Sequence, residues 1–68
     1  MSRLKEKREA AGLSQGKLAK ASGVNKQMIC FYEQGVKDIN KAQALTIYRL
    51  AQTIGCRMED LIETDSQN

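Results

Sequence analysis

Residues 15–34, QGKLAKASGVNKQMICFYEQ, predict two short helices joined by a tight turn. Ser14 and Asn25, which precede the two helices, are favoured N-caps because a side-chain oxygen can accept a backbone N–H group of the first turn. Gly23 separates the two segments, and glycine readily adopts the positive φ that ends a helix and reverses the chain. We therefore expect helices over about residues 15–22 and 26–34.

Three residues of this stretch indicate how the two helices pack. Ala19 carries only a methyl group, so the second helix can approach closely, and Ile29 anchors that helix in the core. Together with the turn at Gly23, this order of residues is typical of a helix-turn-helix, a unit that presents its second helix to the major groove of DNA. The residues expected to share the core are Leu18, Val24, Ile29 and Tyr32.

The rest of the chain predicts three further helices and no strand, because β-branched and polar residues never alternate over a useful run. These helices are expected over about residues 3–11, 41–54 and 57–63, with a loop over residues 35–40. Ser2 and Asn40 are good caps for the first two, whereas Arg57 is an unusual cap for the last. The inward-facing residues predicted for the last two helices are Ala44, Ile47, Leu50, Ala51, Ile54, Met58, Leu61 and Ile62.

The chain of 68 residues is long enough for one small domain, expected over residues 1–63, with a polar tail over residues 64–68. Its net charge of +3 is uneven: residues 1–41 carry nine Lys and Arg against four Asp and Glu, and residues 42–68 carry two against four. The positive excess therefore lies in the same part of the chain as the predicted helix-turn-helix. Simple solubility would also account for a mildly basic chain.

Several function classes find no support in the composition. The chain has no histidine, nucleophile elbow, phosphate loop or paired carboxylates, which argues against an enzyme. The isolated Cys30 and Cys56 offer neither a metal site nor a disulfide framework, and we expect no cofactor. Because the longest apolar runs are only a few residues, we expect no signal peptide or membrane span and a cytoplasmic protein with reduced thiols.

Over about residues 3–63 the chain resembles the Cro and phage-repressor class of helix-turn-helix domains, also called the xenobiotic-response-element family. The matching residues are Arg8, AGLSQGKLA at 11–19, GV at 23–24, Ile29, YEQG at 32–35, LTIYRLAQTIG at 45–55 and MEDLI at 58–62. The resemblance implies an all-α, compact five-helix lambda-repressor-like domain. It also implies a bacterial or phage transcriptional regulator that binds double-stranded DNA with the helix at about residues 26–34.

The outward face of that helix supplies four candidate DNA contacts. Gln27 can make two hydrogen bonds to adenine, and Lys26 can reach a phosphate or the edge of guanine. Phe31 offers apolar contact to a thymine methyl group, although an aromatic residue at helical spacing is more often part of a core. Cys30 is either a small neighbour of the interface or a redox-sensitive thiol.

The resemblance assigns roles to four residues on other parts of the unit. Gln15 resembles the family glutamine that binds phosphate, and it can also support a side chain of the helix at residues 26–34. Lys37 lies in the loop that family members place against the DNA backbone. Arg8 and Glu33 stand where the family has a partly buried ion pair, which would fix the first helix against the third.

A domain this small makes few DNA contacts, so we expect a homodimer on two half-sites roughly 34 Å apart. The ends of the last two helices, with Leu61 or Ile62, are the expected dimer surface. An alternative is an antitoxin or anti-regulator of the same fold that acts mainly through a protein partner. The acidic residues that could make such a contact are Glu59, Asp60, Glu63 and Asp65.

Overall fold

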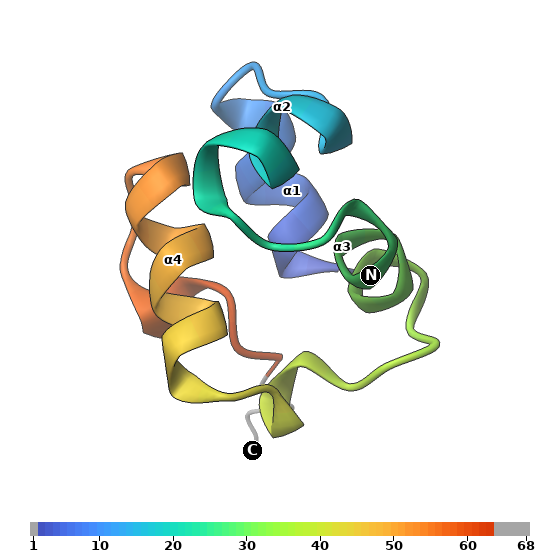
Figure 1. Cartoon of the computed structure of the whole chain (residues 1–68). Helices are drawn as coiled ribbons and strands as arrows, with labels where there is room; N and C mark the ends of the chain where they lie inside the picture. The colour runs from blue at the N-terminus through green and yellow to red at the C-terminus, as the bar shows by residue number, and fades with distance from the viewer. Residues whose placement is uncertain (1, 64–68) are drawn as a thin grey trace.

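A computed structural model describes residues 2–63 of the chain, and this part contains four α-helices and two 3-10 turns without any strand (Figure 1). In chain order the elements are α1 (Arg3–Ala10), α2 (Gln15–Ser22), α3 (Lys26–Gln34), η1 (Ile39–Lys41), α4 (Ala44–Ile54) and η2 (Met58–Asp60). The all-α prediction is confirmed, and α2 and α3 have the predicted bounds. The predicted tail, residues 64–68, lies outside the described residues.

Local signals explain the first three helices. Side-chain oxygens of Ser2, Ser14 and Asn25 each accept a backbone N–H group from the first turn of α1, α2 and α3, respectively. Such caps satisfy donors that have no partner inside the helix. Gly23 ends α2 with a φ of 77°, as the turn between α2 and α3 requires.

The predicted fifth helix is wrong, because only the 3-10 turn η2 forms there. Arg57 has no side-chain acceptor with which to cap a helix. Instead, the Asp60 carboxylate accepts the Arg57 backbone N–H at 3.0 Å and closes a single turn. That one turn is enough to bring Leu61 into the core, where its side chain is fully buried. The hypothesis that Leu61 belongs to a dimer surface is therefore wrong, while Ile62 is partly exposed.

The fourth helix begins later than predicted. Residues 39–41 form η1, which Asp38 caps and which buries Ile39, and the chain then turns again before α4 begins at Ala44. Asn40 does not cap α4, since its side chain is bound to Glu63. Ala44, predicted to face inward, lies exposed in the first turn of α4. Helical periodicity locates the buried face of α4 but does not detect this additional change of direction.

One small core holds the elements together. α2 packs against both α3 and α4, as Figure 1 shows, and α1 packs against α3. Every α-helix and the segment after η2 contribute one large, fully buried side chain, and these residues are Leu4, Leu18, Ile29, Leu50 and Leu61. Burial of a leucine or isoleucine contributes about 1.5–3 kcal/mol, so these five side chains are the main apolar support of the α2–α3 pair.

Two glycines of the same unit should respond oppositely to alanine. We expect Gly23→Ala to lower the free energy of unfolding by about 1–2 kcal/mol, because an L residue is strained at positive φ. Gly16 is helical, and a Cβ there would meet only the Ser14 hydroxyl oxygen at 4.0 Å. Gly16→Ala should therefore raise the free energy of unfolding by about 0.5 kcal/mol. Urea unfolding checks both values, and a Gly23→Ala variant as stable as the parent would contradict the turn geometry.

Candidate nucleic-acid interface

The first turns of α2 and α3 border one open hollow on the surface. Its lining residues are Gln15, Asn25, Lys26, Gln27 and Cys30. Lys26 and Gln27 are exposed at the start of α3, whereas Gln15 and Cys30 are partly buried beside them. The structure thus brings together four of the six residues that the sequence nominated for DNA contact. Asn25, which the sequence suggested only as a cap, also belongs to this surface.

The other two nominated residues lie farther along the chain. Phe31 is partly buried in the second half of α3, so only part of its ring is available to a ligand. Lys37 is exposed in the loop after α3, where it borders a different hollow. The backbone N–H groups of Val36 and Lys37 both donate to the carbonyl oxygen of Phe31, at 2.9 and 3.2 Å. This loop therefore begins close against the end of α3.

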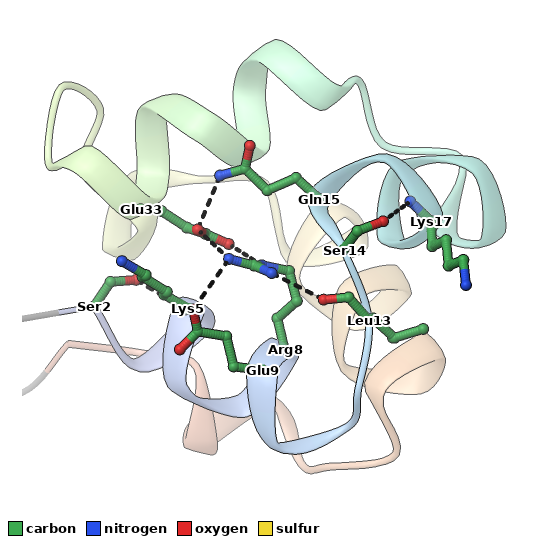
Figure 2. Close-up of polar contacts among 9 residues, drawn as sticks. All are labelled: Ser2, Lys5, Arg8, Glu9, Leu13, Ser14, Gln15, Lys17 and Glu33. Atoms are coloured by element: carbon green, nitrogen blue, oxygen red, sulfur yellow. Dashed lines mark hydrogen bonds and ion pairs between the residues drawn. The ribbon is translucent and has the colours of Figure 1, made fainter.

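An ion pair joins the first and third helices below this surface (Figure 2). Arg8 donates from Nε to Glu33 Oε2 at 2.7 Å and from Nη2 to Glu33 Oε1 at 3.0 Å. Its remaining nitrogen, Nη1, donates to the carbonyl oxygen of Leu13 at 2.8 Å. The Arg8 and Glu33 side chains are only 10% and 4% exposed. One guanidinium thus holds α1, the α1–α2 loop and the last turn of α3 at fixed positions.

Gln15 connects this ion pair to the surface hollow. Its Nε2 donates to Glu33 Oε1 at 3.0 Å, and Figure 2 shows the amide oxygen pointing away from the carboxylate. Gln15 therefore does contact a side chain of α3, but that side chain is Glu33 of the ion pair. No sequence pattern indicates this contact, because Gln15 and Glu33 are 18 residues apart on different helices.

The Helix-turn-helix family model HTH_3 matches residues 4–61 of the chain. The chain belongs to the Cro/C1-type helix-turn-helix family. This membership makes it a DNA-binding transcription regulator and agrees with the surface at the starts of α2 and α3. No curated protein and no solved structure matches the chain at a significant level.

The two groups of the Arg8–Glu33 pair shift each other's pKa. Burial raises the pKa of the Glu33 carboxyl, but hydrogen bonds from Arg8 and Gln15 and the charges of Arg8 and Lys5 together hold that pKa below its ordinary value. The hydrogen bond to Glu33 raises the pKa of Arg8. Both groups therefore remain charged at neutral pH, and each is compensated by its partner.

The described part of the chain offers little basis for thiol or metal chemistry. Burial, together with the nearby charge of Asp60, raises the pKa of the Cys56 thiol, which keeps it protonated and weakly nucleophilic. Residues 2–63 contain no group of three or more His, Cys, Asp and Glu side chains placed to bind a metal ion. None of the described helices is long and apolar enough to span a bilayer.

Removing the Glu33 carboxylate should destabilise the domain strongly. We expect Glu33→Ala to cost about 3–5 kcal/mol of unfolding free energy, because it leaves the buried Arg8 charge without its buried carboxylate partner. Glu9 is the matched control, since it lies 3.9 Å from the same guanidinium but is 58% exposed. Glu9→Ala should cost less than about 1 kcal/mol. Equal losses for the two variants in thermal or urea unfolding would contradict the structural role of the pair.

The lowered pKa of Glu33 also predicts a pH dependence of stability. Its stabilising contribution is complete above the unfolded pKa, near 4.5, and is lost as the pH falls through the lower folded pKa. In that window the unfolded chain binds a proton that the folded chain does not, so acid favours unfolding. Because Asp60 also has a lowered pKa and acts in the same direction, the parent must be compared with Glu33→Gln.

The difference in unfolding free energy between the parent and Glu33→Gln should shrink as the pH falls below 4.5. Protonation makes Glu33 neutral, like glutamine, so the advantage of the carboxylate disappears. Denaturant unfolding at a series of pH values measures this difference. A difference that stays constant down to about pH 3 would show that Glu33 has no lowered pKa in the folded state.

Proposed function

We propose that this regulator binds specific sites in double-stranded DNA by placing α3 in the major groove. One observation carries the proposal: Lys26 and Gln27 project from the exposed start of α3, beside Gln15 of α2 and over one hollow. Ile29, which lies on the opposite side of the same helix from Gln27, is fully buried. The helix is therefore held by one face while polar side chains at its start remain free to contact base edges.

The chemistry of each side chain suggests its role in this complex. The Gln27 amide offers a donor and an acceptor that match adenine N7 and N6, and Lys26 matches a phosphate or guanine. Gln15 uses one N–H bond for Glu33, which leaves the second N–H bond for a phosphate oxygen. The free backbone N–H groups at the starts of α2 and α3 also favour phosphate. Cys30 is a neighbour of these contacts.

In the proposed complex, Phe31 and Lys37 contact DNA from outside the hollow that the other four residues line. The exposed part of the Phe31 ring would meet a thymine methyl group. Lys37, exposed on the loop after α3, would meet the phosphate backbone. Each phosphate neutralised by such a cation makes the affinity fall more steeply with salt, by roughly 0.9 log unit per log unit of salt concentration.

We propose that two copies bind two half-sites about one helical turn of DNA apart. Leu45 and Tyr48, which are 54% and 48% exposed and lie one turn apart on α4, offer an apolar surface for a second copy, whereas the exposed Val36 lies on the loop after α3. Ile62 is partly buried, so it can add only part of its side chain to a dimer surface. The proposed site of action is the bacterial cytoplasm, where chromosomal or phage DNA is accessible.

The alternative of an antitoxin or anti-regulator gains no support from the described acidic residues. The Asp60 carboxylate accepts the backbone N–H of Arg57, and the Glu63 carboxylate accepts that of Arg3. Glu59 is exposed, and Asp65 lies outside the described residues. Much of the acidic surface on which that alternative depends is therefore engaged within the domain.

Selection from random duplex DNA tests the proposed function. We expect the retained pool to contain a two-fold symmetric site with two similar halves. Gln27→Ala should weaken binding to that site by about 1–3 kcal/mol per half-site contact while leaving binding to unrelated DNA unchanged. Gln52→Ala, which removes an exposed amide from α4, is the matched control and should bind like the parent.

Two results would contradict the proposal. If the retained pool shows no enriched site, the regulator binds DNA without sequence preference. If an enriched site appears but Gln27→Ala binds it as tightly as Gln52→Ala does, the base contact by Gln27 is wrong. A single asymmetric half-site would contradict the dimer and leave the base contact standing.

A further inference from the structure

Glu63 joins three segments that are far apart in the sequence. Its carboxylate oxygen Oε2 accepts the backbone N–H of Arg3, the first residue of α1, at 2.7 Å. Its backbone N–H donates to Asn40 Oδ1 at 2.8 Å, and its carbonyl oxygen accepts from Asn40 Nδ2 at 2.6 Å. In Figure 1 the red end of the coloured chain returns toward the turn η1.

The paired bonds between Asn40 and Glu63 restrict more than a single bond would. The Asn40 amide meets the backbone of Glu63 with both its donor and its acceptor, much as two strands pair. Two parallel bonds fix orientation as well as distance, because rotation about one of them breaks the other. The third bond, to Arg3, ties this pair to the start of α1. The start of α1 also benefits electrostatically from a negative charge.

The position of the loop before Asn40 depends on the contacts at its two ends. Residues 35–38 are exposed, and Gly35, Lys37 and Asp38 border a hollow of about 320 Å³ that Ser2 and Glu63 also line. Because its four residues are exposed, little side-chain packing fixes the position of this loop. One end is held by the two N–H groups that donate to the Phe31 carbonyl. The other end is held by buried Ile39 and by the bonds between Asn40 and Glu63.

We infer that Asn40 and Glu63 are positioning residues that hold Lys37 in place for its contact with a DNA phosphate. This inference rests on the proposed function, which places Lys37 at the phosphate backbone. The bonds from Val36 and Lys37 to the Phe31 carbonyl hold the start of the loop, and buried Ile39 fixes the depth at which the chain returns to the core. The Asn40–Glu63 bonds fix the direction in which the chain leaves the loop, so the Lys37 ammonium reaches the phosphate with less loss of conformational freedom on binding.

The salt dependence of DNA binding tests this inference. We compare the parent with Lys37→Ala, Asn40→Ala, the double variant and the control Gln52→Ala, using the full chain, the selected duplex and an unrelated duplex. Lys37→Ala should lower the slope of log affinity against log salt by about 0.9 for each bound copy, the value for one phosphate contact. Asn40→Ala should lower it by a similar amount, although it removes no charge. The double variant should lose no more than Lys37→Ala alone.

Loop mobility in the free protein supplies a second measurement. Backbone ¹⁵N relaxation of residues 36–38 should show increased motion in Asn40→Ala and a smaller increase in Glu63→Gln, which keeps the backbone pair but weakens the bond to Arg3. Circular dichroism at the binding temperature confirms that each variant is folded. If Asn40→Ala does not fold, Asn40→Asp replaces it, since it keeps the acceptor for the Glu63 N–H and loses the donor.

The outcomes separate this inference from the proposed function. If Lys37→Ala lowers the slope and the Asn40 variant keeps the parent slope, or if their effects add in the double variant, the positioning role is wrong and the phosphate contact stands. If Lys37→Ala keeps the parent slope, both the phosphate contact and the positioning role are wrong. Base recognition by Gln27 is judged by the selection experiment and is unaffected by either result.

Discussion

The ion pair between Arg8 and Glu33 is the interaction on which the geometry of the DNA-binding surface depends. It joins α1 to the last turn of α3, and through the Leu13 carbonyl it also holds the loop that leads into α2. A buried charge pair is weak evidence of net stability, since both ions lose their hydration. Its value lies in directional bonds that an apolar contact could not supply, because they set the orientation of α3 relative to α1.

The same carboxylate connects the frame of the domain with its functional surface. Glu33 accepts the amide of Gln15, so the residue that anchors α3 also orients a side chain at the edge of the hollow. The apolar core supplies the remaining support, with Ile29 holding the inner face of α3 and Leu18 that of α2. Lys26 and Gln27 can therefore be polar and exposed without weakening the packing.

The sequence predicted the first half of the structure better than the second half. In the first half, Ser14, Gly23 and Asn25 act within one or two residues of the helix ends they determine, so α2 and α3 were located correctly. In the second half, Asn40 has a side chain that often caps helices, but here it pairs with Glu63, 23 residues away. Arg57 offers no acceptor to start a helix, and a single turn closed by Asp60 takes the place of the predicted fifth helix.

The sequence by itself determined the helical class, the two central helices and the buried face of α3, because these follow from caps, glycine turns and the period of apolar residues. Its resemblance to known helix-turn-helix domains indicated the family. The sequence also placed Lys26 and Gln27 on the outward face of α3. Only the tertiary structure decided that Gln15 binds Glu33, that Leu61 is core rather than dimer surface, and that Asn40 and Glu63 join the ends of the domain. These contacts depend on distances between separate elements, which packing of the whole core fixes and no local pattern encodes.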